Sequence, residues 1–168
     1  MSYAKIDKSL IEVTADGEKR SDKAYRMFLE GFNCSQSVVL AFCDLFDIPE
    51  DTAKRMSASF GGGMGRMREV CGAFSGIIMV LGLFAGQTDG GDQEAKKENY
   101  RLVQEAAELF REENKGSIIC REILGLEKAE GTFVPAPRTD EYYKKRPCPE
   151  TIRGAAAIVV KILDKYVT

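Results

Sequence analysis

Residues 70–86 read VCGAFSGIIMVLGLFAG, and this stretch, apolar or small at every position except Ser75, decides the fold. As an α-helix it would be about 25 Å long, which is shorter than the roughly 30 Å hydrocarbon core of a membrane. Charged residues stand on either side, at Glu69 and Asp89, and the neighbouring segments are amphipathic. The pattern therefore predicts a helix buried at the centre of a helical bundle and disfavours a membrane span.

Six further helices are expected around this one, because apolar residues recur at helical spacing between capping and breaking residues. They are expected at residues 21–30, 35–46, 51–57, 92–114, 117–125 and 149–166. Alternating strand patterns are scarce and no internal repeat is present, so the predicted fold class is all-α. We expect a single domain over residues 1–168, a bundle of five to seven helices around the buried apolar helix near residues 70–86, with residues 1–20 as a loosely ordered N-terminal segment.

Two pairs of glycines at four-residue spacing lie in the apolar stretch, Gly72 with Gly76 and Gly82 with Gly86. Residues four apart lie nearly in line on one helix face, and the missing side chains there permit another backbone to approach closely. We therefore expect Gly72 and Gly76 to face a neighbouring helix at short range.

The composition excludes several classes of function. The chain has 24 Lys and Arg, 26 Asp and Glu and a net charge of −2, without a basic block, so nucleic acid is not an expected partner. The absence of histidine excludes His-dependent nucleophile pairs, His-bound zinc and His-ligated haem, so any metal would need cysteine or carboxylate ligands. The N-terminal residues lack the apolar core of a secretory signal, which predicts a cytoplasmic location. In that reducing compartment, five thiols favour metal binding or redox chemistry over structural disulfides.

Four of the five cysteines stand where a helix is expected to begin: Cys34, Cys71, Cys120 and Cys148. A helix start offers unpaired N–H groups and a partial positive charge, and both favour the thiolate, which is the reactive and metal-binding form of cysteine. Cys43 lies inside an expected helix, half a turn away from Cys34, so we expect it to be a buried residue apart from the others. For each of the four taken singly, the alternative is also a small buried hydrophobic residue. None belongs to a CxxC pair, so the four can converge only through the fold.

A glycine-rich loop with the sequence GGGMGR, residues 61–66, precedes Cys71. Successive glycines can direct N–H groups at an anion, but the loop lacks the Lys-Ser/Thr ending of a P-loop and no strand precedes it. We expect instead that the loop crowds the cysteine site, which would be surrounded by Gly61, Gly62, Gly63, Gly65, Arg66 and Gly72. Because Arg66 and Arg68 lie within five residues of Cys71, we predict that Cys71 is the most acidic thiol.

Read together, an early cysteine, the block CGAFSG at residues 71–76 and two later single cysteines resemble the family named C_GCAxxG_C_C after this pattern. The resemblance covers about residues 23–165 and implies a redox-active protein, often encoded beside transporter genes. By the resemblance Cys34, Cys71, Cys120 and Cys148 are the four cysteines of the family, and Cys43 is additional. A similar domain occurs in split-Soret-type cytochromes, for which an iron–sulfur site has been proposed, but this chain has no CxxCH sequence to carry a haem.

Two hypotheses follow for the function. In the first, the four cysteines are redox-active, either as ligands of an iron–sulfur cluster or as a dithiol/disulfide site. In the second, their thiolates hold a structural zinc ion in a non-catalytic metal-binding or interaction protein. The sequence leaves open the choice between iron–sulfur, zinc and no cofactor, and with it whether the protein is an enzyme. The expected partners are an unidentified redox partner and, by the resemblance, a membrane transporter system, while the chain itself is not expected to span a membrane.

Overall fold

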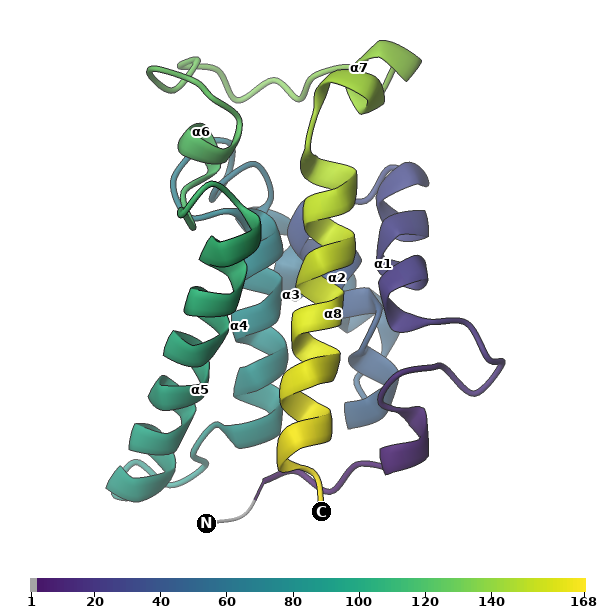
Figure 1. Cartoon of the computed structure of the whole chain (residues 1–168), viewed down its shortest axis with the longest axis vertical. Helices are drawn as coiled ribbons and strands as arrows, with labels where there is room; N and C mark the ends of the chain where they lie inside the picture. The colour runs from purple at the N-terminus through teal and green to yellow at the C-terminus, as the bar shows by residue number, and fades with distance from the viewer. Residues whose placement is uncertain (1–2) are drawn as a thin grey trace.

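The computed structural model describes residues 3–168, and within them every regular element is a helix (Figure 1). Eight α-helices and three short 3-10 helices are present in this range, and its only β-type contacts are two isolated bridges. The α-helices are α1 (Arg20–Leu29), α2 (Cys34–Leu40), α3 (Glu50–Ser57), α4 (Gly72–Ala85), α5 (Gln93–Glu113), α6 (Cys120–Ile123), α7 (Asp140–Lys145) and α8 (Cys148–Tyr166). The all-α prediction is confirmed, and α7 is a short addition in a segment where the sequence predicts no helix.

Helix α4 lies at the centre of the bundle, as its apolar sequence predicts. It packs against α2, α5 and α8, while α1 packs on α8 and α2 (Figure 1). Phe74, Ile77, Val80 and Leu81 of α4 are each at most 2% exposed. No helix within residues 3–168 is both long enough and apolar enough to cross a membrane. The apolar stretch is therefore the core helix around which the others assemble.

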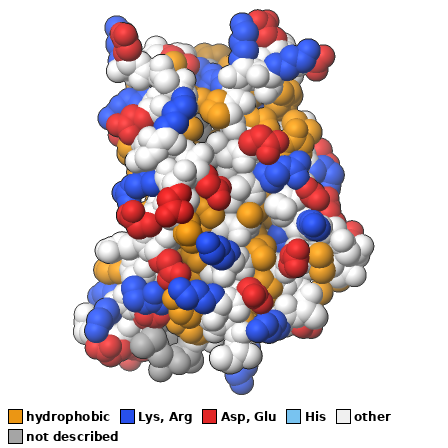
Figure 2. Space-filling model, in the orientation of Figure 1, with side chains coloured by type: hydrophobic (Ala, Val, Ile, Leu, Met, Phe, Trp, Pro, Cys, Tyr) orange, Lys and Arg blue, Asp and Glu red, His pale blue; other side chains and the backbone are white. Residues whose placement is uncertain are grey.

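The outer surface carries charges of both signs. On the face shown in Figure 2, basic and acidic side chains are interspersed over the helices. Along α5, for example, Arg101 pairs with Glu98 at 2.5 Å and with Glu105 at 3.0 Å. Surface pairs of this kind contribute little to stability. Neither sign of charge therefore dominates this outer face.

The single helix predicted over residues 35–46 is wrong, because the chain forms two elements there. Helix α2 ends at Leu40, and a 3-10 helix, η2 (Cys43–Phe46), follows. At this break the fully buried Arg20 donates from its Nη1 to the Ala41 carbonyl at 2.6 Å and pairs with the Asp44 carboxylate at 2.5 Å. The Ala41 carbonyl thus has a partner outside the helix.

The described part of the N-terminal segment, residues 3–19, is held against the bundle, although a loosely ordered segment is expected there. The Tyr3 ring stacks on Phe84 with the ring centroids 4.5 Å apart, and the Ala4 N–H donates to the Phe84 carbonyl at 2.7 Å. Ile11 is 2% exposed and belongs to the main core. The segment therefore covers the C-terminal end of α4, opposite the end where Cys71 lies.

The glycines near the start of α4 face α2 at short range, as predicted. A Cβ atom at Gly76 would lie 2.7 Å from the Val38 Cβ atom, and one at Gly72 would lie 3.1 Å from the Cys34 Cβ atom. A Cβ atom at Gly82, in the same helix, would meet nothing within 4 Å, so no close contact requires glycine at that position. Glycine is therefore required only at the end of α4 that approaches α2 and Cys34.

Replacing these two glycines by alanine should change stability in opposite directions. Gly76→Ala should lower the free energy of unfolding by about 1–3 kcal/mol, because the added methyl group overpacks against Val38. Gly82→Ala should raise the free energy of unfolding by about 0.5–1 kcal/mol. Gly82 is exposed to solvent in the middle of α4, where alanine has the higher helix propensity. Denaturant titrations of both variants measure the two changes. A Gly76→Ala protein as stable as the wild type would show that the α2–α4 contact can open at no cost.

Candidate functional site

Each of the four predicted site cysteines stands at the start of a helix. Cys34, Cys120 and Cys148 are the first residues of α2, α6 and α8, and Cys71 is the N-cap of α4. Local sequence explains two of these starts. Asn33 and Gln36 form a capping box at α2, and Pro149 occupies a position near the start of α8 where proline is favoured. All four cysteines therefore stand at helix starts, as the sequence predicts.

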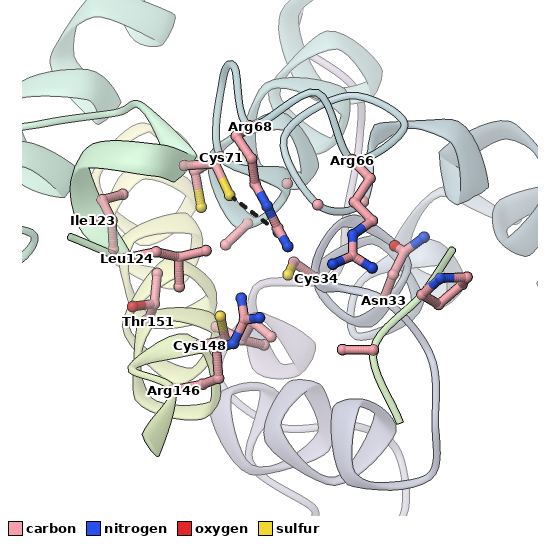
Figure 3. A pocket seen from close by; sticks show the side chains of 18 of the residues that line it. Asn33, Cys34, Arg66, Arg68, Cys71, Ile123, Leu124, Arg146, Cys148 and Thr151 are labelled. Atoms are coloured by element: carbon pink, nitrogen blue, oxygen red, sulfur yellow. Dashed lines mark hydrogen bonds between the residues drawn. The ribbon is translucent and has the colours of Figure 1, made fainter. Parts of the chain in front are cut away.

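The four side chains line one cavity of about 290 Å³ (Figure 3). Its wall comes from the starts of α2, α4, α6 and α8, from the glycine-rich loop and from the segment between α6 and α8. Cys43 does not line it. That residue is 3% exposed, packs with Val39, Leu40 and Ala53, and donates from its Sγ to the Leu40 carbonyl at 3.7 Å. Cys43 thus lies apart from the other cysteines, as the sequence predicts.

Backbone hydrogen bonds hold the starts of α4 and α6 together. The Cys71 N–H donates to the Ile118 carbonyl at 2.8 Å, and the Cys120 N–H donates to the Glu69 carbonyl at 2.7 Å. These bonds surround an isolated antiparallel bridge between the two segments. Since the close contact of Gly72 with Cys34 brings the start of α2 to the same place, backbone packing holds Cys34, Cys71 and Cys120 near one another.

The glycine-rich loop turns in a left-handed conformation beside the cysteines. Backbone φ is positive at Gly62, Gly63, Met64, Gly65, Arg66 and Arg68. A Cβ atom at Gly63 would lie 2.7 Å from the Cys120 Cβ atom, so glycine is required there for space as well as for conformation. Of the residues expected around the site, Gly61, Gly62, Gly65, Arg66 and Gly72 line the cavity, whereas Gly63 lies against Cys120 without lining it.

Cys34 and Cys148 are the two cavity cysteines that are partly exposed as residues, whereas Cys71 and Cys120 are each only 7% exposed. Hydrogen bonding from the Cys148 side chain, against the opposing effect of burial, lowers the pKa of Cys34 to about 7. The same interaction raises the pKa of Cys148, and burial raises it further. At pH 7 about half of the Cys34 thiols are therefore ionised, while Cys148 keeps its proton.

The prediction that Cys71 is the most acidic thiol is wrong. Burial raises the pKa of Cys71 to about 12, and the hydrogen bonds from two backbone N–H groups at the start of α4 are too weak to offset it. Arg66 and Arg68 are not directed at Cys71: both pair with Glu130, at 3.5 Å and 2.7 Å, and Arg68 also donates to the Cys120 sulfur at 3.8 Å. At this position the loss of solvation therefore raises the pKa of Cys71 by more than the N–H groups of the helix start lower it. Burial raises the pKa of Cys120 in the same way.

Four arginines line the cavity: Arg66, Arg68, Arg138 and Arg146. The sequence analysis identified the first two and missed the others, which come from the proline-rich segment around α7. Arg138 donates to the Phe28 and Phe32 carbonyls at 3.2 Å and 3.3 Å, and its charge helps to lower the pKa of Cys34. Arg146 lies over the Tyr142 ring, 5.0 Å from its centroid. For Arg146, the available signal was the basic run KKR at residues 144–146, which only Pro147 separates from Cys148.

The thiols do not form a compact metal site as they lie. Within residues 3–168, no three His, Cys, Asp or Glu side chains are close enough together to hold a metal ion, and all five cysteines are free. A tetrahedral zinc site needs four ligands about 2.0–2.3 Å from one ion. A single ion would therefore require the side chains to rotate.

A family model described as "Putative redox-active protein (C_GCAxxG_C_C)" matches residues 32–162. No curated protein and no solved structure gives a significant match. The matched range contains all four cavity cysteines and all the arginines that line the cavity. The expected redox partner, the link to transporters and the cytoplasmic location stay predictions.

Proposed function

Because the chain belongs to the C_GCAxxG_C_C family of redox-active proteins, we propose that it is a thiol oxidoreductase in which Cys34 and Cys148 cycle between dithiol and disulfide. The observation that carries this proposal is the pair itself. Both cysteines line the cavity and are partly exposed, and the neighbouring Cys148 side chain lowers the pKa of Cys34 to about 7. A thiol with a pKa near the ambient pH is the most effective attacking group in thiol–disulfide exchange.

The reaction has two exchange steps. The Cys34 thiolate attacks a substrate disulfide R–S–S–R′, which forms a Cys34–S–S–R bond and releases R′–S⁻. The Cys148 sulfur, after losing its proton, then attacks the Cys34 sulfur, which forms the Cys34–Cys148 disulfide and releases R–S⁻. The leaving thiolates take up protons, so the substrate gains two electrons and the protein pair loses two. An external dithiol reverses the change by the same chemistry and returns both protein thiols.

The first step prepares the second. The pKa of Cys148 is raised chiefly by its hydrogen bond to the Cys34 sulfur, which carries the negative charge. When Cys34 becomes part of a mixed disulfide, that charge is gone and the cause of the raised pKa is removed. Cys148 therefore loses its proton more easily at the stage where its sulfur must attack. Cys71 and Cys120, buried and with raised pKa values, stay protonated during this cycle.

Replacing Cys148 with serine should trap the mixed disulfide. Serine keeps a hydroxyl group that can donate to the Cys34 thiolate, so Cys34 still attacks, but no second sulfur is available to release it. With hydroxyethyl disulfide as the probe, intact-mass measurement should show nearly complete mixed disulfide on Cys148→Ser, whereas the wild type forms the internal disulfide. The matched control Cys120→Ser should behave like the wild type. An internal disulfide in Cys148→Ser would assign the resolving role to another cysteine.

A second candidate is an iron–sulfur cluster, which is favoured by the position of all four thiols on one cavity. Helix-start N–H groups and arginines would then hydrogen-bond the cluster sulfurs and tune its potential. Purification without oxygen distinguishes the candidates. Brown protein with iron and sulfide indicates a cluster, colourless protein with one equivalent of zinc indicates a structural site, and metal-free protein that loses two thiols on oxidation supports the dithiol proposal.

A further inference from the structure

The charged side chains that line the cavity are all cationic. They are Arg66, Arg68, Arg138 and Arg146, and the lining contains no Asp or Glu. Glu130 pairs with Arg66 and Arg68, which leaves Arg138 and Arg146 without a salt bridge in the part of the chain that the structure describes. The outer face in Figure 2 mixes both signs. The excess of positive charge is therefore a property of the cavity and not of the whole surface.

Two of these guanidinium groups are largely withdrawn from solvent beside the sulfurs. The Arg68 side chain is 6% exposed, and its Nη1 lies 3.8 Å from the Cys120 Sγ. The Arg66 side chain is 15% exposed, and its buried Nε has no hydrogen-bond partner among the described residues. Figure 3 shows these side chains and Arg146 extending into the space around Cys34 and Cys148. Guanidinium groups held in this way favour an anionic ligand in the cavity, because they form strong, charge-assisted hydrogen bonds with carboxylates.

The size of the cavity restricts the ligand to a small molecule. Its volume of about 290 Å³ is at the lower end of the range for small-molecule sites. Part of its wall is apolar, formed by Ile123, Leu124 and Pro135. This combination fits a compact molecule with an apolar, polarisable centre and charged ends.

On these grounds, and resting on the dithiol chemistry proposed above, we infer that the substrate is a small disulfide with anionic groups, such as carboxylates, near its sulfur atoms. Guanidinium groups bind such groups through paired, charge-assisted hydrogen bonds. They also offset the repulsion between the Cys34 thiolate and an anionic substrate. During the exchange, negative charge moves from Cys34 to the leaving sulfur and stays within the arginine-lined cavity.

Arg146 allows this inference to be tested separately from the reactivity of Cys34. The charge of Arg138 helps to lower the pKa of Cys34, so its removal would slow every reaction of that thiol. Arg146 instead acts on Cys148 and Cys120, whose raised pKa values it partly offsets. Lys144, two residues earlier, is exposed and does not line the cavity, so Lys144→Gln is a control with the same loss of charge.

The experiment compares three aliphatic disulfides of similar size: dithiodipropionate, which is anionic, hydroxyethyl disulfide, which is neutral, and cystamine, which is cationic. The initial rate of the reaction at Cys34 is measured at low salt by quenching and mass spectrometry. Arg146→Gln should lower the rate with dithiodipropionate about 5–10-fold, change the rate with hydroxyethyl disulfide by less than about twofold and raise the rate with cystamine. These changes are expected for the loss of one partly screened charge. Arg146→Lys should retain most of the wild-type rates, and Lys144→Gln should change none of the three by more than about twofold.

The outcomes separate the inference from the function on which it rests. If Arg146→Gln changes all three rates equally, or leaves all three unchanged, while the Cys34–Cys148 disulfide still forms, the anionic substrate is wrong and the dithiol function stands. If neither dithiodipropionate nor hydroxyethyl disulfide oxidises Cys34 in the wild type, the dithiol function is wrong and the inference falls with it. A lower rate with the anionic disulfide together with a higher rate with the cationic one supports both the dithiol function and the anionic substrate.

Discussion

Cys34→Ser should reduce the rate of reaction with small disulfides by about 10³-fold or more, the loss expected when a nucleophile is removed. The reason is that Cys34 is the one cavity thiol whose pKa is lowered, to about 7, whereas burial raises those of Cys71 and Cys120. A serine hydroxyl is not ionised near neutral pH and cannot replace the thiolate. The measurement is the consumption of hydroxyethyl disulfide by metal-free protein at neutral pH.

Cys43→Ala provides the matched control for this loss. Cys43 is buried in a separate cluster and does not line the cavity, so its replacement should leave the rate within about twofold of the wild type. Thermal melts of both variants verify that the fold is intact. Retention of more than about a tenth of the wild-type rate in folded Cys34→Ser would identify another thiol as the nucleophile.

Alkylation by iodoacetamide should follow the ionisation of Cys34. A thiol reacts as its thiolate, so the labelling rate of Cys34 should rise with pH, reach half its maximum near pH 7 and level off above that. Cys71, with a pKa of about 12, is almost fully protonated at pH 7. Because a more basic thiolate is also intrinsically more nucleophilic, the expected advantage of Cys34 at pH 7 is about 10²–10³-fold before access is considered. Peptide mapping of labelled protein over a pH series measures both rates.

The same titration tests the cause of the acidity. Cys148→Ala removes the hydrogen bond that contributes most to the lowered pKa of Cys34, so the midpoint should move upward toward the ordinary range of a thiol. Cys148→Ser, which keeps a donor, should move it less. A midpoint that stays near pH 7 in Cys148→Ala would show that the hydrogen bond is not responsible, and faster labelling of Cys71 than of Cys34 would reverse the assignment of the nucleophile.

Local signals made the helices and the positions of the cysteines predictable. The apolar stretch at residues 70–86 indicated the core helix, and apolar residues at helical spacing between capping and breaking residues indicated the others. The break after Leu40 was not predicted, and the buried Arg20 that bonds the Ala41 carbonyl there comes from a distant part of the chain. A residue that bonds across the fold leaves no periodic signature in the sequence.

The reactivity within the site depended on packing and was not predictable in the same way. The helix-start context is common to Cys34 and Cys71, yet the pKa of one is lowered and that of the other is raised. The difference arises from the neighbouring Cys148 and from burial, both of which are tertiary features. Arg138 and Arg146 were missed for a similar reason, since they reach the cavity only because the segment before α8 folds over it.

The most direct test of the dithiol site is to map the disulfide that forms when the metal-free protein is oxidised. After reaction with one equivalent of hydroxyethyl disulfide, the protein is blocked with an alkylating agent and digested without reductant. The expected result is a cross-linked peptide that joins Cys34 to Cys148, with Cys43, Cys71 and Cys120 alkylated as free thiols. A main cross-link between Cys71 and Cys120, or five free thiols after oxidation, would contradict the assignment of Cys34 and Cys148 as the redox pair.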